Sequence, residues 1–390
     1  MRPTTIAFTL VVTAALFAGA SCADADPTAS PSPDAGASDS QAVDDGATPD
    51  DDGGSEPVPT GCVGEWCSIA VDGMRDIALN AVSGSAPDNV WIVGTKGFVA
   101  RFNGTEWENH RIDTLLTLFS VWTSGPTDVW VANTGNTLFH WDGTKWEEST
   151  LEGAVDDSRA VLALVGSGPD NVLALTESSY AFGTECPVSW GTTNIGCPKI
   201  YRRSRIEGDL SWRVASDPEY TCENLVEGST CANLNALWVD PNGDPWAVGA
   251  AGRAVRPQGA APPPTIRGGL DETYSIATLQ GISGSSSDDA WAVGATGTIR
   301  HFTGGSWKAV SAPTNAHLRA VWSRAATEAW AVGDQGAILH WDGKSWELAS
   351  SPLDERPRDL RSVWGASNGD VWTLGARVLL RRQPQPVSQP

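Results

Sequence analysis

One unit of about 40 residues recurs along this chain, and its period constrains the fold more than any other feature. In the clearest copy, residues 329–346 read Ala-Trp-Ala-Val-Gly-Asp-Gln-Gly-Ala-Ile-Leu-His-Trp-Asp-Gly-Lys-Ser-Trp. Two short apolar runs flank a Gly-x-x-Gly turn, and an Asp-Gly turn leads to a closing Trp, which predicts three consecutive antiparallel strands. Residues 318–322, which read Leu-Arg-Ala-Val-Trp, predict a fourth strand before them.

Seven copies of the unit can be aligned on the second strand. Six carry a Trp there, and Val172-Leu173 supplies a degenerate copy: Trp91, Trp130, Trp246, Trp291, Trp330 and Trp372. Neighbouring copies lie 39 to 45 residues apart, except for one interval of 73 that contains an insertion. Short strands with glycine turns at this period are typical of β-propellers. We therefore predict an all-β, seven-bladed β-propeller, with first strands beginning at Leu79, Leu118, Ala160, Leu234, Leu279, Leu318 and Leu360.

The last copy is incomplete. Residues 360–382 provide three strands and then run into Gln-Pro-Gln-Pro, whereas residues 65–71 form an outer strand with no blade of its own. An open ring would leave an unpaired strand edge. We predict that the N-terminal strand pairs with the last blade and closes the ring.

Glycine turns separate the strands of each blade. The Gly-x-x-Gly pairs, expected where φ is positive, connect strands two and three at residues 94–97, 249–252, 294–297 and 333–336. Asn103-Gly104, Asp142-Gly143 and Asp342-Gly343 turn strand three into strand four.

The N-terminus predicts export. Residues 1–21 have a charged start and an apolar run that is short for a bilayer span, as in a signal peptide. Leu16-Phe-Ala-Gly-Ala-Ser-Cys22 resembles a bacterial lipobox, in which Cys22 would be lipidated, although Gly19 stands where Leu is usual. The alternative is ordinary cleavage nearby, with Cys22 lost or free.

Residues 22–61 predict a disordered acidic linker. Residues 1–60 contain ten acids and one base, and residues 23–60 have almost no large apolar side chains. After a lipidated Cys22, the linker would act as a spacer that lifts residues 62–382, the propeller, off a membrane. Residues 383–390 predict a disordered tail. The net charge of −21 argues against nucleic-acid binding, which needs a basic surface.

The six remaining cysteines form three pairs close in sequence. An even number in an exported chain predicts disulfides, most simply Cys62–Cys67, Cys186–Cys197 and Cys222–Cys231. A metal site is not expected, because no CxxC occurs and no His lies at ligand spacing. No cofactor is expected.

Eighteen of the nineteen tryptophans occupy repeat positions and are interpreted as core or blade-to-blade packing. Trp190 is outside the repeat, in the insertion at residues 177–198. All four tyrosines fall in the same region, and the candidate ligand-binding residues are Trp190, Tyr180, Tyr201 and Tyr220. Rigid aromatic side chains on disulfide-braced loops suit recognition. The alternative is that these loops only cap a weak pair of blades.

One repeat position is basic in several blades. His140, His301 and His340 occupy it, and Arg101, Arg256 and Arg381 replace them elsewhere. The position is either a basic ring for a partner or a cross-strand contact within each blade, and we favour the contact. No HExxH motif and no Walker-type loop occurs, and no catalytic residue is assigned.

The unit Trp-Ala-Val-Gly-x-x-Gly-x-Ile-x-His-[Trp/Phe]-x-Gly-x-x-Trp resembles the photosystem II stability/assembly factor family and the wider BNR-like propellers. The resemblance covers Trp66 to about Arg382. It implies a seven-bladed binding platform and, in the assembly factors, arginine-rich patches for partners. The turn before Trp346 is one residue shorter than is common there.

Together these features predict an exported, lipid-anchored, monomeric and non-catalytic binding module of the cell envelope, with a protein or glycan as its partner. A glycan-active, sialidase-like hydrolase and an envelope assembly factor are the alternative interpretations.

Overall fold

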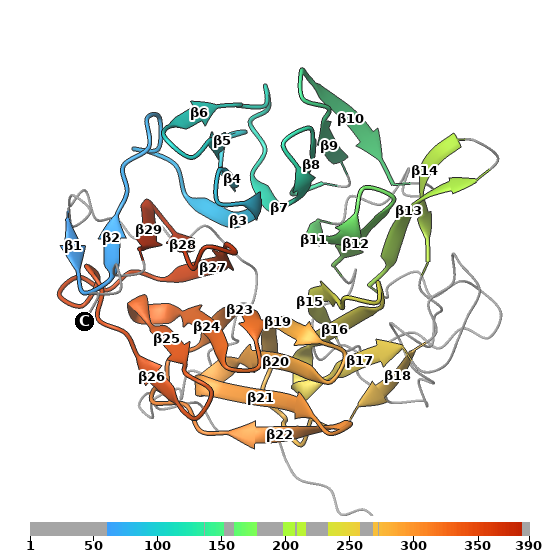
Figure 1. Cartoon of the computed structure of the whole chain (residues 1–390). Coiled ribbons are helices and arrows are strands. Elements are labelled where there is room, and N and C mark those ends of the chain that lie inside the picture. Colours follow the sequence, from blue (N-terminus) through green and yellow to red (C-terminus); the bar gives the residue numbers. More distant parts are fainter. Residues whose placement is uncertain are drawn as a thin grey trace, which may run out of the picture. The chain divides into compact units, whose positions relative to one another are not determined.

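Seven antiparallel β-sheets follow one another along the chain in the computed structural model, which describes residues 61–135, 137–151, 160–177, 198–206, 209–215, 233–257, 268–271 and 273–383 (Figure 1). The predicted signal peptide, Cys22, the acidic linker and the C-terminal tail lie outside these residues, apart from Gly61 and Gln383. No helix in the described ranges has the length and apolar character needed to cross a membrane.

Each sheet is one blade: six sheets have four strands in sequence order, and the seventh has five strands that come from both ends of the chain. The innermost strands are β3 (Leu79–Ala86), β7 (Leu118–Gly125), β11 (Val161–Gly168), β15 (Leu234–Val239), β19 (Leu279–Ser286), β23 (Leu318–Ala325) and β27 (Leu360–Gly365). The second strands are β4 (Asn89–Gly94), β8 (Asp128–Asn133), β12 (Asn171–Thr176), β16 (Pro245–Gly249), β20 (Asp289–Gly294), β24 (Glu328–Gly333) and β28 (Val371–Gly375).

The third strands are β5 (Val99–Phe102), β9 (Thr137–Trp141), β13 (Ile200–Ile206), β17 (Ala254–Pro257), β21 (Thr298–Thr303), β25 (Ile338–Trp341) and β29 (Val378–Arg382). The fourth strands are β6 (Trp107–Asn109), β10 (Trp146–Thr150), β14 (Asp209–Val214), β18 (Gly268–Asp271), β22 (Ser306–Val310) and β26 (Trp346–Leu348). Each innermost strand contacts the next, and β27 contacts β3, so the seven-bladed ring is closed and the predicted fold is confirmed.

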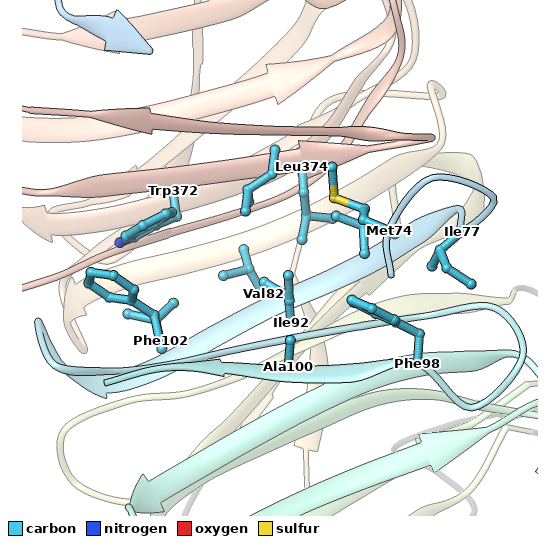
Figure 2. Packing of buried hydrophobic residues seen from close by; sticks show 12 residues of the cluster. Met74, Ile77, Val82, Ile92, Phe98, Ala100, Phe102, Trp372 and Leu374 are labelled. Carbon is cyan, nitrogen blue, oxygen red and sulfur yellow. The ribbon is translucent and has the colours of Figure 1, made fainter. Parts of the chain in front are cut away.

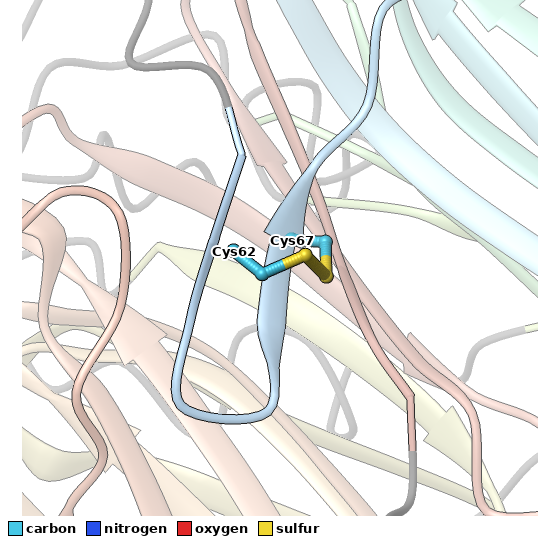
Figure 3. The surroundings of a disulfide bond; sticks show 2 residues. All are labelled: Cys62 and Cys67. Atoms are coloured by element: carbon cyan, nitrogen blue, oxygen red, sulfur yellow. A yellow bond between two sulfur atoms is a disulfide. The ribbon is translucent and has the colours of Figure 1, made fainter.

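The N-terminal strand completes the last blade, as predicted. The strand β2 (Trp66–Ser68) pairs antiparallel with β29, and Trp66 lies opposite Arg382. A further strand, β1 (Cys62–Val63), extends the same sheet, and the disulfide Cys62–Cys67 joins β1 to β2 (Figure 3). The ring is therefore closed by hydrogen bonds between segments more than 300 residues apart, and Arg382 Nε, 2.7 Å from Glu65 Oε2, adds an ion pair to the closure.

The core lies between the blades. At the interface of blades 7 and 1, Trp372 and Leu374 face Val82, Ile92 and Phe102 (Figure 2). Side chains from both sheets thus interdigitate, as in other sheet-on-sheet packing. Six of the seven interfaces repeat one feature, an edge-on pair between a second-strand Trp and a fourth-strand Trp of the next blade. The pairs are Trp91–Trp146, Trp130–Trp212, Trp246–Trp307, Trp291–Trp346, Trp330–Trp66 and Trp372–Trp107.

These six pairs have ring centroids 5.1 to 6.4 Å apart and interplanar angles of 74° to 90°. Such geometry suits the quadrupoles of the two indoles. The interpretation of these tryptophans as blade-to-blade packing is therefore confirmed. The interface between blades 3 and 4 differs, because β12 has Leu173 in place of Trp and β18 contains no Trp. Aliphatic residues, including Leu173, Leu175 and Ile200, fill it instead.

In the Gly-x-x-Gly turns, the second glycine has the predicted positive φ and the first does not. In the turn after β24, Gln335 and Gly336 have φ of 58° and 72°, so the second glycine lies in the left-handed region as expected. Gly333 is extended, with φ of −170°, and is not needed for positive φ. A Cβ on Gly333 would lie 2.0 Å from the carbonyl oxygen of His317, so this position requires glycine because two backbones approach closely.

The closing strand provides the first prediction. Trp66 is 1% exposed and packs edge-on against Trp330, so Trp66→Ala should remove packing from the core and lower the free energy of unfolding by about 3–5 kcal/mol. Chemical denaturation would measure this loss. Val63→Ala, in the same hairpin but 42% exposed, is the matched control and should cost less than about 1 kcal/mol. Equal losses for the two variants would show that Trp66 does not close the ring.

Candidate functional site

The two faces of the ring are built from different segments. Because successive strands are antiparallel, the turns between strands two and three and the connections between blades emerge at one end of every blade. We call this end the GxxG face. The turns between strands one and two, and between strands three and four, form the opposite face.

The basic repeat position is a contact within each blade. In blade 5, the ring of His301 stacks on Trp291 with centroids 3.8 Å apart and planes 2° apart. His301 Nε2 also lies 2.7 Å from Asp289 Oδ1. His140 repeats this arrangement in blade 2, where it stacks on Trp130 and its Nε2 lies 2.8 Å from Asp128 Oδ1.

In two other blades an arginine at the same repeat position also contacts the second-strand Trp and a polar side chain of its own blade. Arg101 Nε donates to Asn89 Oδ1 at 3.0 Å, and its guanidinium lies 5.9 Å from the Trp91 ring. Arg381 pairs with Asp370 at 2.6 Å and covers Trp372 at 4.8 Å. These bases are occupied by partners of their own blade, which supports the cross-strand interpretation over a basic ring.

The predicted loop residues fall mostly outside the described chain. Trp190, Tyr180, Tyr220, Cys186, Cys197, Cys222 and Cys231 lie there, and so do both predicted disulfides that involve these cysteines. Tyr201 is described, and its position corrects the expectation that it offers an aromatic surface to a ligand. It lies on β13, is 1% exposed, and packs in the core with Trp130 and Trp212.

The innermost strands share a feature that the repeat did not reveal. All seven have a register shift after their first residue, so the second residue is a β-bulge outside the ladder. Bulges redirect a side chain, and they are common next to functional sites. Each bulge lies opposite the end of a second strand, on the GxxG face. We call the seven residues the bulge ring: Asn80, Phe119, Leu162, Asn235, Gln280, Arg319 and Arg361.

The bulge ring is chemically graded around the inner rim. Phe119 and Leu162 are adjacent apolar members, Asn80, Asn235 and Gln280 are amides, and Arg319 and Arg361 are adjacent cations. The first residue of the same strands is always Leu or Val and is fully buried. The sequence carries a signal for this ring, because the second residue of each innermost strand varies in chemistry whereas the first is always Leu or Val. The interpretation of the sequence missed that signal.

Hydrogen bonds connect part of the ring across the blades. Arg361 Nη1 donates to Asn80 Oδ1 at 2.9 Å, and Asn80 Nδ2 donates to the carbonyl oxygen of Leu118 at 2.9 Å. This relay joins blades 7, 1 and 2 and ends beside Phe119. Arg319 is held differently, because its guanidinium pairs with Asp334 and lies 3.7 Å from Asp359.

Exposed apolar side chains also favour the GxxG face. Of seven large apolar side chains that are exposed in the described ranges, four lie on connections between blades at this face: Leu115, Leu116, Tyr274 and Ile276. The other three lie on outer strands, namely Val63, Val214 and Leu348. They form two pairs, one on the connection between blades 1 and 2 and the other on the connection between blades 4 and 5.

Tyr274 is presented by a constrained backbone. Its φ is 54°, a conformation that a bulky residue adopts only when its surroundings impose it. Arg300 provides that support, since its Nε donates to the Thr273 carbonyl at 2.8 Å and its Nη2 to the Tyr274 carbonyl at 3.3 Å. Tyr274 is 76% exposed and Ile276 is 94% exposed, so a braced turn displays an aromatic and an aliphatic side chain to solvent.

No known protein family and no curated protein matches the sequence. The solved structures show the fold. The structure of YCF48 bound to D1 peptide matches with a TM-score of 0.59 at 17% identity, covering 84% of this chain and 99% of that chain. YCF48 from Cyanidioschyzon merolae matches with a TM-score of 0.59 at 15% identity, covering 82% and 99%. A streptogramin B lyase matches at 0.54 and 12% identity, covering 81% and 96%. Identities this low establish a shared propeller fold and nothing of the activity.

Asp289, the acidic partner of His301, makes the stability of the fold depend on pH. Burial would raise the pKa of Asp289, but hydrogen bonds from His301 and Ser285 outweigh it and leave the pKa below its usual value. A carboxyl with a lowered folded-state pKa stabilises the fold above its unfolded pKa of about 3.9 and loses that contribution as the pH falls through the folded pKa. Asp289→Asn should cost about 1–3 kcal/mol at pH 7 and flatten the acid limb of the stability curve.

Denaturation at pH 7 and at pH 3 would measure both effects. Asp288→Asn, on the exposed adjacent turn residue, should leave the acid limb unchanged. If the two variants gave the same pH profile, the Asp289–His301 pair would have no structural role.

Proposed function

We propose that the chain is an exported, lipid-anchored and non-catalytic β-propeller that binds a protein partner through its GxxG face. The observation that carries the proposal is the braced turn at residues 273–276, which displays Tyr274 and Ile276. A side chain that is already ordered loses little conformational entropy when it is buried by a partner. Tyrosine is among the residues that most often dominate binding energy at protein interfaces.

A polypeptide ligand is better supported than a glycan. YCF48, which shares the fold, is described as bound to D1 peptide. Leu115, Leu116 and Ile276 are aliphatic, and they match apolar side chains of a protein better than the hydroxyl groups of a sugar.

Binding is also better supported than glycan hydrolysis. Most glycosidases need two carboxylates beside the reacting bond. The seven innermost strands, which surround the centre of the ring, contain no Asp or Glu. Their charged residues are Arg319, Arg324 and Arg361.

Exposed apolar residues of the braced turn should dominate partner binding. Replacing Tyr274 and Ile276 together by Ser should weaken binding at least tenfold, because the change removes the proposed central contact. The measurement compares the envelope proteins captured by wild type and variant, quantified by mass spectrometry. Leu348→Ser, which is 55% exposed on an outer strand, is the matched control and should capture the same proteins as wild type. Undiminished capture by the Tyr274/Ile276 variant would exclude the GxxG face as the binding surface.

Trp190→Ala tests the insertion separately. If residues 177–198 add to the same interface, as the sequence predicts, this variant should also lose captured protein. Capture equal to wild type would limit the interface to the described surface.

Export and anchoring rest on the sequence of the first 61 residues. Mass spectrometry of the mature protein should find a diacylglyceryl-modified Cys22 as the first residue, and Cys22→Ser should move the protein from the membrane to the soluble fraction. A single acyl chain anchors only weakly, so a stable anchor requires more than one chain. An unmodified N-terminus at another residue would contradict the lipid anchor while leaving export intact.

A further inference from the structure

We propose that one arc of the bulge ring, formed by Arg361, Asn80, Phe119 and Leu162, binds a carboxylate of the polypeptide partner together with an apolar side chain next to it. The inference rests on the proposed function and specifies what the inner rim of the GxxG face recognises. It uses residues that are separate from the braced turn at Tyr274.

Arg361 has a positive charge that no acidic group neutralises within the described chain. Arg319, Arg324, Arg381 and Arg382 each pair with a carboxylate, whereas Arg361 has only the amide oxygen of Asn80. The innermost strands around it contain no acid. An anionic ligand would therefore meet an uncompensated cation at this point of the rim.

The relay fixes the guanidinium in place before a ligand arrives. Asn80 is 8% exposed, and both ends of its amide are engaged, one by Arg361 and the other by the Leu118 carbonyl. Only one of the five N–H donors of Arg361 has a partner in the described ranges. The remaining donors form a planar fork, which matches the two oxygens of a carboxylate.

Phe119 and Leu162 provide the apolar half of the arc. Both are partly exposed, and neither belongs to any of the seven core clusters of the described residues. Phe119 directly follows Leu118, whose carbonyl ends the relay, so the apolar side chains continue the arc that begins at Arg361. Leu162 is the bulge residue of the next blade. A ligand with a carboxylate beside an apolar side chain would satisfy both halves at once.

Such a carboxylate has two sources in a polypeptide. It can be the free C-terminus after Phe or Leu, or the side chain of an internal Asp that precedes Phe or Leu. Both present the same planar anion beside an apolar group, and the experiment distinguishes them.

The experiment uses four pools of fluorescein-labelled octapeptides and the full-length mature protein in detergent. The first pool ends in Phe or Leu with a free carboxylate, and the second is the same pool amidated. The third is amidated and contains an internal Asp-Phe or Asp-Leu pair, and the fourth has Asn in place of that Asp. Fluorescence polarisation should show at least tenfold tighter binding to the first or third pool than to its neutral counterpart.

Four variants locate the interaction. Arg361→Gln should abolish the preference for the acidic pool, Arg361→Lys should retain part of it because the charge remains, and Phe119→Ala should weaken binding to both forms. Arg324→Gln is the matched control, since Arg324 lies in an innermost strand near its opposite end and the substitution removes the same charge. Thermal melts should place all four variants within a few degrees of wild type.

Equal binding of acidic and neutral pools, binding to none of the pools, or equal effects of Arg361→Gln and Arg324→Gln would each overturn the proposal. A preference that survives in Arg361→Gln would overturn it as well. These results are independent of partner capture by the Tyr274/Ile276 variant. If capture depends on that turn and the peptides show no carboxylate preference, the carboxylate site is wrong and the proposed function stands.

Discussion

The edge-on contact between two tryptophans of neighbouring blades is the interaction on which the rest of the structure depends. Each second-strand Trp of six blades meets a fourth-strand Trp of the following blade, and each pair contributes about 0.5–1.5 kcal/mol beyond the apolar area that it buries. A four-stranded blade has two apolar faces and cannot bury both alone, so the repeat is stable only as a closed ring. The N-terminal strand supplies Trp66 to this series, and ring closure therefore uses the same contact as every regular interface.

The Trp pairs and the first residue of each innermost strand hold the ring together, and the bulge position beside them differs in residue type from blade to blade. The first residue of each innermost strand, such as Leu79 or Leu360, is fully buried between blades, and substitutions there would open cavities. The next residue is a bulge outside the ladder, so it has no partner residue in the register of the neighbouring strand. Phenylalanine, leucine, an amide or an arginine occupies it in different blades. Recognition can thus change from blade to blade while the packing that closes the ring stays the same.

The period of the sequence predicts most of the fold, because strand alternation and glycine turns are local patterns that the ring repeats. The seven blades and the closing strand at Trp66 follow from it, whereas the Cys62–Cys67 disulfide was predicted from the even number of cysteines in a chain expected to be exported. The bulge ring was not predicted, although each bulge adds one residue to its strand and breaks the alternation there: the buried residues Leu79 and Val82, for example, are three positions apart. Composition alone also misled at Tyr201, where an aromatic residue close to an insertion is part of the core. At Gly333 the sequence predicts glycine, but the physical reason for glycine is a contact that the sequence does not show. A Cβ there would lie 2.0 Å from the carbonyl oxygen of His317, in the connection between blades.

The interface between blades 3 and 4 shows what closure permits. This interface lacks the Trp pair. Arg202 of β13 lies near Asp244 of blade 4, and burial disfavours both charges. Burial lowers the pKa of Arg202 and raises the pKa of Asp244. In an open array such an interface would separate first, because each repeat is held only by its neighbours. In a closed ring, blades 3 and 4 are each held on their other side by a Trp pair, Trp130–Trp212 and Trp246–Trp307. Separating them therefore requires a second interface to deform. The ring accepts one interface without a Trp pair, and the sequence departs furthest from its repeat in the two blades that form it.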